Sequence, residues 1–441
     1  MHPDAEPYPR IDAPPPDDAT RGGLGRLVAL ALVGGALAGL VGGLFRRSLA
    51  WADVARTTLL DWTREEPALR WAVPVLCAAA AVALARLVVR WVPDAGGSGV
   101  QRVEANMRSE IGFAPWQVVP AKFIGGFLAI GAGLALGREG PSVQMGAAIG
   151  SEAGRIGGVP EHDRRTLSAA LAGAGLGVAF SAPLGGAVFV FEEVSRAVRT
   201  RLVVTTLAGS AAAVAVAHQI VTDGPILPVP DVASGPMWTL ALFAALGVLL
   251  GGMGVAYNRV VILFLDWSDR LPSIPPEAKA AVIGALVGLL GILSPAIVGG
   301  GEELNEAILL GRYSLGGLLL VLVVRWVLGP LSYAAGAPGG LFAPLLVVGA
   351  AAGAVLAEGL NLIAPGLDLS PIAFAIVGMS TFFSAVVRAP LTGVILIVEM
   401  TATTSLLVPM LLAAATAVVT ATLLRGPPVY DSLRERLPSQ G

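Results

Sequence analysis

The sequence predicts an all-α, polytopic membrane protein. Of its 441 residues, 55% are hydrophobic and 14% are charged, whereas soluble domains carry roughly 25% charged residues. Several apolar runs contain no charge, and each approaches the ~20 residues that a helix needs to cross the hydrocarbon core. These runs lie at 27–45, 202–221, 237–257 and 280–298. The 56 glycines are scattered through apolar stretches, where they permit close helix contacts or helix breaks.

The amino terminus and the net charge limit the expected partners. Residues 1–22 are rich in proline and aspartate and offer no apolar core followed by a cleavage site. We therefore expect a disordered tail ahead of a transmembrane domain at 23–437. The net charge of −2 gives no basic surface for nucleic acid. The expected partners are the lipid bilayer and small ions.

Cysteine and histidine are too few and too scattered for a metal centre. Cys77 is the only cysteine and lies in an apolar run, which excludes an intrachain disulfide and a cysteine cluster. The three histidines are His2, His162 and His218, and their separation does not suggest a shared set of ligands. We therefore expect no metal and no cofactor.

Two apolar runs are too short to cross a membrane, and both end in charged residues. The run at 123–136 ends at Gly137-Arg138-Glu139, and the run at 182–191 ends at Glu192-Glu193. Both patterns are typical of partial or broken helices. Unpaired backbone groups are costly in lipid, so such breaks are tolerated where protein buries them or where they line a cavity. The breaks therefore indicate a binding site.

An internal repeat indicates a two-half architecture typical of transporters. Ala-Pro-Leu-Gly-Gly at 182–186 and Ala-Pro-Leu-Thr-Gly at 389–393 are each followed six positions later by glutamate, an offset of 207 residues. A second pattern, proline followed five positions later by Gly-Ala-Ala, begins at Pro141 and again at Pro344, an offset of 203. The repeat alone does not show whether the halves are inverted.

These offsets predict the division of the domain. We expect a first half at about 23–221, a second half at about 236–425 and a C-terminal cytoplasmic helix at about 428–437. By the positive-inside rule, two arginine-bearing loops of the first half are cytoplasmic, so the segment between them enters the membrane and returns. Their arginines are Arg155, Arg164 and Arg165 in one loop and Arg196, Arg199 and Arg201 in the other.

Four short motifs make the functional prediction specific. In chain order they are Gly97-Ser98-Gly99-Val100, Gly137-Arg138-Glu139-Gly140-Pro141, Gly340-Leu341-Phe342-Ala343-Pro344 and Tyr430. With Lys122-Phe123-Ile124-Gly125-Gly126 and Arg388-Ala389-Pro390-Leu391, the set resembles the CLC family of chloride channels and chloride/proton antiporters, in its prokaryotic type. The resemblance covers about residues 27–437. It implies two inverted-topology repeats whose broken and re-entrant helices meet at a central anion pathway.

The motifs suit an anion for a physical reason. Dehydrated chloride needs partial positive charge without a full cation that would trap it, and a helix N-terminus supplies N–H groups and a dipole. Seen alone, Ser98 also suits a helix cap, and Tyr430 also suits an aromatic residue at the lipid–water interface. The family resemblance implies that chloride is bound by Ser98, Arg138, Gly140, Leu341, Phe342 and Tyr430.

Glu139 is the expected gate and proton carrier. A carboxylate within an apolar region is costly and is normally retained for a function. The alternative is a structural ion pair with Arg138, but adjacent residues on a helix do not face each other. Ionised Glu139 can occupy an anion site, and its protonation lets chloride take its place.

Glu193 distinguishes antiporters from channels within the family. The resemblance implies that it is the internal proton-transfer glutamate, which channels of the family commonly lack. The alternative is that Glu192 and Glu193 mark a helix end that meets water or pairs with Arg196. By the same alignment, Glu192 and its repeat counterpart Glu399 serve helix packing or pairing rather than transport.

The resemblance also implies a homodimer with one pathway per subunit, in a bacterial inner membrane with cytoplasmic termini. The sequence ends soon after Tyr430, so we expect no nucleotide-sensing domains and no nucleotide as a partner. Ser98 favours chloride over nitrate by the same resemblance. Gln101 stands where the family usually has proline, which weakens the expectation of a helix start there.

The predicted function is an electrogenic chloride/proton antiporter, and three other functions are compatible with parts of the pattern. A passive gated chloride channel of the same fold can retain Glu193 without using it. A sodium-coupled solute transporter also has broken helices and repeats, but it does not need the anion motifs. A membrane-embedded enzyme is disfavoured because the spans contain no metal-ligand spacing, aspartate-rich pair or Ser/His dyad.

Overall fold

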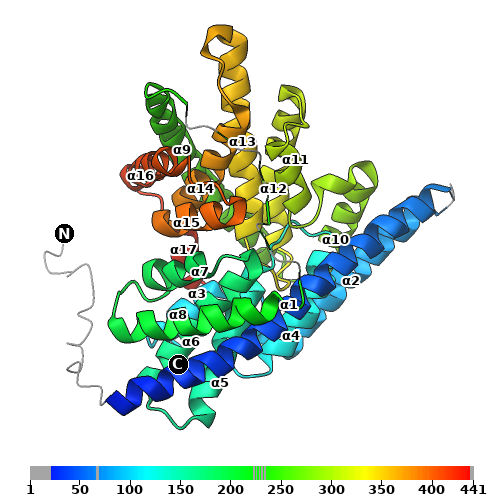
Figure 1. Cartoon of the computed structure of the whole chain (residues 1–441). Coiled ribbons are helices and arrows are strands. Elements are labelled where there is room, and N and C mark those ends of the chain that lie inside the picture. Colours follow the sequence, from blue (N-terminus) through cyan, green and yellow to red (C-terminus); the bar gives the residue numbers. More distant parts are fainter. Residues whose placement is uncertain are drawn as a thin grey trace, which may run out of the picture.

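Two sets of α-helices follow one another in the same order, as a computed structural model shows (Figure 1). It describes residues 21–65, 69–221 and 235–437, with positions 224, 226, 227, 229 and 232 between the last two ranges. The first set comprises α1 (Arg21–Glu65), α2 (Ala72–Trp91), α3 (Val100–Met107), α4 (Val118–Gly131), α5 (Glu139–Ile156), α6 (Glu161–Phe180), α7 (Pro183–Phe189) and α8 (Thr200–Ala217). The second comprises α9 (Thr239–Asp269), α10 (Pro276–Leu293), α11 (Glu302–Leu309), α12 (Leu315–Tyr333), α13 (Phe342–Ile363), α14 (Pro371–Val387), α15 (Pro390–Thr401) and α16 (Leu407–Leu423). A last helix, α17 (Val429–Arg434), follows.

The predicted element boundaries differ slightly from the observed ones. Helix α1 begins at Arg21, which lies inside the tail expected at 1–22; residues 1–20 are outside the described residues. Seven described helices are long and apolar enough to cross a membrane. The apolar run expected to end at Glu192-Glu193 forms α7 and then widens into a π-helical turn at Val190–Val194.

The two sets pack in equivalent ways. Helix α5 packs along α6 as α13 packs along α14, and α1 packs along α8 as α9 packs along α16. The repeated glycines explain this closeness: a Cβ on Gly146 would lie 2.0 Å from the Leu171 carbonyl oxygen, and one on Gly349 would lie 2.4 Å from that of Gly378. Small residues let helix backbones approach where lipid gives little other drive to associate.

Reciprocal hydrogen bonds join the halves around a pseudo-twofold axis. The Glu192 carboxylate accepts the backbone N–H groups of Leu391 (3.0 Å) and Thr392 (2.7 Å) at the start of α15. The Glu399 carboxylate accepts those of Leu184 (3.1 Å) and Gly185 (2.7 Å) at the start of α7. Each acid therefore satisfies amides that a helix start leaves unpaired. The structure thus gives the repeated glutamates the packing role predicted for them.

The starts of α5 and α13 meet at the centre of the molecule. Gly137 and Gly340 form an antiparallel bridge, with N–O distances of 2.9 Å and 2.8 Å. From this bridge α13 runs toward the top of the view and α5 toward the bottom (Figure 1). The halves are therefore inverted relative to each other, and two broken helices begin at one central point, the geometry known from transporters with midplane sites.

Candidate functional site

The Glu139 carboxylate lies on the N-terminus of the opposite half's broken helix. Glu139 is the first residue of α5, and its Oε1 accepts the backbone N–H of Ala343 in the first turn of α13 at 3.2 Å. The side chain is fully buried, and Oε2 has no hydrogen-bond partner among the described residues. Because a helix N-terminus favours negative charge, the acid occupies a position that suits an anion.

Three glycines shape the space around this carboxylate. A Cβ on Gly137 would lie 2.0 Å from Glu139 Oε2, and one on Gly340 would lie 2.5 Å from Oε1. A Cβ on Gly140 would lie 2.7 Å from Ser98 Oγ and 2.9 Å from the Cα of Gly340. Glycine is therefore required where the Ser98 loop, the start of α5 and the Gly340 loop come together.

Ser98 and Tyr430 meet on the inner side of this junction. The hydroxyl oxygens of both residues are buried and have no hydrogen-bond partner among the described residues. A Cβ on Gly140 would lie 2.7 Å from the Ser98 hydroxyl oxygen, and Tyr430 interacts electrostatically with Glu139. An unpartnered buried hydroxyl is costly, and two such donors suit an anion. The structure therefore brings Ser98, Glu139 and Tyr430 into one neighbourhood, and their role in binding chloride stays a prediction.

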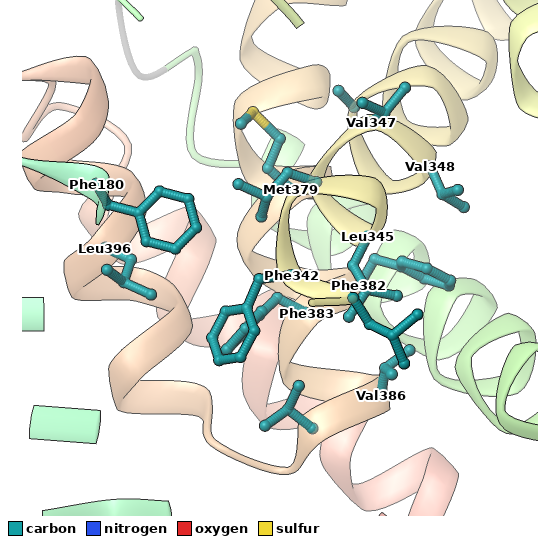
Figure 2. Close-up of a cluster of buried hydrophobic side chains, with 14 of the residues drawn as sticks. Phe180, Phe342, Leu345, Val347, Val348, Met379, Phe382, Phe383, Val386 and Leu396 are labelled. Atoms are coloured by element: carbon teal, nitrogen blue, oxygen red, sulfur yellow. The ribbon is translucent and has the colours of Figure 1, made fainter. Parts of the chain in front are cut away.

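Leu341 and Phe342 form a third group of residues around the Glu139 carboxylate. Leu341 is the residue before α13 and Phe342 its first residue, so their amides belong to the part of the helix start that lacks intrahelical partners. The Phe342 ring lies 5.9 Å from that of Tyr430 and 4.7 Å from that of Phe383, centroid to centroid. Figure 2 shows Phe342 beside Phe383 within this apolar packing. The aromatic contacts fix the start of α13 beside Tyr430.

Buried cations hold the loops that precede the short helices of each half. Lys122 is fully buried, and its Nζ donates to the carbonyl oxygens of Gly97 (2.6 Å) and Ser98 (3.0 Å). Arg325, which lies 203 residues later, is also fully buried and donates to the carbonyls of Gly299 (2.8 Å) and Gly300 (2.9 Å). The offset is that of the repeat, so each half uses one cation to fix one loop.

The guanidinium of Arg138 has its partners away from the Glu139 carboxylate. Its Nε donates to the Ala179 carbonyl at 2.9 Å, and its Nη2 lies 2.7 Å from Glu302 Oε1. The alternative of a structural pair between Arg138 and Glu139 therefore has no direct contact to support it. A role for Arg138 in chloride binding stays a prediction.

Glu193 lies at the inner end of the site, within the π-helical turn. Its side chain is 2% exposed, and Oε1 lies 3.7 Å from Arg196 Nη2. The two adjacent acids of this turn have different partners: Glu192 accepts from the start of α15, and Glu193 interacts with Glu104 of α3. The extra width of a π-helical turn separates their directions. Arg196 also donates to Asp431, the residue after Tyr430, at 3.1 Å. Arg196 thus links Glu193 to the short helix α17 that carries Tyr430.

Glu104 and Glu302 are the site-adjacent residues that sequence analysis missed. Glu104 is fully buried, and neither of its carboxyl oxygens has a hydrogen-bond partner within the described chain, yet it interacts electrostatically with Glu193. A signal was present, because Glu104 lies six residues after Ser98 in a short helix that follows a glycine break.

This geometry defines a class of protein: a polytopic membrane transport protein with an anion pathway built from broken helices. The chain belongs to the voltage gated chloride channel family, whose model matches residues 79–422. The resemblance inferred from the motifs is therefore confirmed. Family membership also removes the membrane-embedded enzyme from the alternatives.

Sequence relatives and solved structures agree with this assignment. The chain is 36% identical over 423 residues to the H⁺/Cl⁻ exchange transporter ClcA of Vibrio parahaemolyticus, covering 93% of this chain and 89% of that protein. It is 34% identical over 419 residues to the ClcA transporter of Salmonella typhi, covering 93% and 88%. Among solved structures, it matches a slow cyanobacterial Cl⁻/H⁺ antiporter with a TM-score of 0.89 and 33% identity, covering 93% and 97%.

A more distant structure supports the fold alone. The chain matches a CLC-type fluoride/proton antiporter with a TM-score of 0.78 and 19% identity, covering 94% of this chain and 98% of the other. The predicted all-α fold with inverted repeats is therefore confirmed. The matched substrates differ between these structures, so selectivity has to be argued from this chain's own residues.

Proposed function

We propose that this protein is an electrogenic chloride/proton antiporter. The observation that carries the proposal is the Glu139 carboxylate, which is buried on the N-terminus of α13 and accepts the Ala343 amide. An acid in that position competes with chloride for the same amides. When it takes up a proton it loses the attraction to the helix start, and chloride replaces it. Glu139 therefore acts both as the gate and as a proton carrier.

Chloride bound on the inner side of Glu139 is held by neutral donors. Ser98 and Tyr430 contribute hydroxyl groups, and Gly140, Leu341 and Phe342 contribute backbone near the start of α5 and α13. The structure places no arginine or lysine head group in direct contact with the described hydroxyl pair. Neutral donors bind the ion without trapping it, which release on either side requires.

The inner proton route begins at Glu193. This acid is nearly fully buried, lies beside Glu104 and is 3.7 Å from the half-exposed Arg196. A proton that arrives from the cytoplasm is taken up by Glu193 and passed toward Glu139 by a path separate from the chloride site. Chloride and protons then move in opposite directions and their charges add, so each elementary charge crossing feels roughly 2.3 kcal/mol per 100 mV.

Reconstituted flux tests the proposal. In liposomes loaded with chloride, chloride efflux should drive protons inward against their gradient, as read by a pH-sensitive dye. Glu193→Gln should abolish proton movement and spare chloride flux, because it removes the inner acid and keeps its shape. Absence of chloride-driven proton movement in the unsubstituted protein would leave a passive gated chloride channel as the function.

The gate has its own test. Glu139→Gln should lose proton coupling and the pH dependence of chloride flux, because a neutral amide neither carries a proton nor competes as an anion. Its chloride flux should be independent of pH between about pH 4.5 and 7.5, a window that spans ordinary carboxyl and histidine titration. A pH profile like that of the unsubstituted protein would remove Glu139 from the mechanism.

The assembly and location follow the same proposal. We place two copies side by side in a bacterial inner membrane, each with its own pathway, and with cytoplasmic termini. The ion pairs Arg196–Asp431 and Arg434–Glu110 join the loop that carries Arg196, the segment after α3, and α17, and the arginines among them support a cytoplasmic location for this end. Chemical crosslinking in native membranes would test the dimer, and a single band at the monomer mass would contradict it.

A further inference from the structure

An ion pair lies where the pathway leaves the gate toward the outside. Arg138 Nη2 and Glu302 Oε1 are 2.7 Å apart, with side chains 12% and 46% exposed respectively. Arg138 directly precedes the gating acid, and Glu302 is the first residue of α11. The pair therefore connects the buried start of α5 to the surface.

The repeat explains why α11 lies at the outer end. Helices α3 and α11 occupy the same place in the two halves, and each follows a glycine in the left-handed region, Gly99 with φ 91° and Gly301 with φ 98°. A Cβ is strained in that conformation, so both starts need glycine. Since the halves are inverted, the Ser98 end of α3 faces the inner site and the start of α11 faces the outer mouth. Beside its glycine the first half carries the neutral hydroxyl group of Ser98. Beside its glycine the second half carries the Glu302 carboxylate.

Arg138 is not the only cation at this mouth. Arg46 interacts electrostatically with both Arg138 and Glu302. It is fixed in place, because Nη1 donates to the Val178 carbonyl at 2.9 Å and to Ser181 Oγ at 2.7 Å. The guanidinium groups of Arg46 and Arg138 therefore lie in the same region, and Glu302 directly contacts that of Arg138.

Other acids nearby do not make this contact. Asp53 pairs with Arg56 at 2.7 Å. Glu303 is exposed and follows Glu302 in the first turn of α11, but it forms no ion pair within the described chain. Glu302 and Glu303 therefore carry the same charge on adjacent exposed residues and differ in their contact with Arg138. This difference isolates the effect of the ion pair from that of surface charge.

We propose that Glu302 sets the affinity of the transporter for external chloride by neutralising Arg138 at the outer mouth. With Glu302 ionised, chloride arriving from outside meets a compensated guanidinium and the Glu139 carboxylate retains its position on α13. Without that charge, Arg138 and Arg46 together attract the incoming anion, and external chloride binds more readily. Glu302 is a positioning residue, since it acts through Arg138 and does not touch the transported ion. The inference rests on the proposed exchange.

Side-specific kinetics test this inference. Chloride-driven proton flux is measured in right-side-out and everted membrane vesicles from expressing cells, with chloride varied on the outer face and ionic strength held constant by gluconate. Glu302→Gln should lower the KM for external chloride about threefold, the size expected for loss of a partly exposed ion pair. The KM for internal chloride and the proton-to-chloride ratio should not change.

Two variants serve as controls. Glu303→Gln removes the same charge without the contact and should leave the external KM unchanged, and Glu302→Asp should keep most of the native value because it retains the carboxylate. Equal shifts in Glu302→Gln and Glu303→Gln, a shift in the internal KM, or no shift at all would overturn the inference. Absence of chloride-driven proton flux in the unsubstituted protein would instead refute the proposed exchange.

Discussion

Gly140→Ala should damage the junction at which three segments meet. The new Cβ would lie 2.7 Å from Ser98 Oγ, 2.9 Å from the Ser98 carbonyl oxygen and 2.9 Å from the Cα of Gly340. The hydroxyl group can rotate away, but the other two atoms belong to the backbone. Relief therefore requires that the Ser98 loop and the Gly340 loop move apart from the start of α5.

The size of the effect follows from that geometry. Overpacking by one methyl group costs typically 1–3 kcal/mol, so we expect a lower thermal unfolding temperature. Displacement of the loops also separates Ser98 from the amides of α13, and we expect chloride affinity to fall by about tenfold, which corresponds to about 1.4 kcal/mol. Isothermal titration with chloride and thermal unfolding in detergent measure the two effects on the same sample.

Gly316→Ala is the matched control for this prediction. Gly316 lies near the start of α12, is exposed, and a Cβ there would have no atom within 4 Å. Its replacement should leave chloride affinity unchanged and stability unchanged or slightly raised, because alanine restricts the unfolded chain. If Gly140→Ala binds chloride as tightly as the unsubstituted protein and unfolds at the same temperature, the crowding deduced from the structure does not govern the site.

Two further predictions concern single contacts. Ser98→Ala and Tyr430→Phe should each weaken chloride binding by about 1 kcal/mol, or about fivefold, because each removes one hydroxyl donor from the ion; isothermal titration measures this, and unchanged affinity in both would exclude the hydroxyl pair. Glu192→Gln should lower thermal stability more than Glu399→Gln, because Glu192 also accepts the Thr392 hydroxyl at 2.7 Å, with a charge-assisted bond contributing about 1.5–3 kcal/mol. Thermal unfolding compares the two variants, and the reverse order would show that the additional hydroxyl contact does not stabilise the fold.

Much of the site was accessible to sequence analysis because its signals are local. Glycines directly before a helical run mark Gly137, Gly140 and Gly340, and a charge inside an apolar stretch marks Glu139. Glu192 and Glu399 were identified as structural through the repeat, and their reciprocal hydrogen bonds bear this out. Each of these signals lies within a few neighbouring residues, so it can be recognised in the sequence alone.

Other residues carried signals too weak to find. Glu104 and Glu302 each lie in a short helix that follows a glycine, but this signal alone does not distinguish them from other helix-forming acids. Glu104 gains its place from burial beside Glu193, and Glu302 gains its place from a contact with Arg138 across 164 residues of chain. The direction of the Arg138 side chain was likewise beyond reach, because a guanidinium selects its partners after the helices have packed.

The sequence by itself determined the membrane environment, the broken helices, the two-half repeat and the family. These properties depend on composition and on motifs of a few residues, since lipid demands long apolar helices and close backbone approach demands glycine. Only the tertiary structure decided which amide meets the Glu139 carboxylate and which acid pairs with Arg138. Such pairings join residues far apart in the chain, 204 positions for the bond from Ala343 to Glu139, and they exist only once the helix starts have packed together.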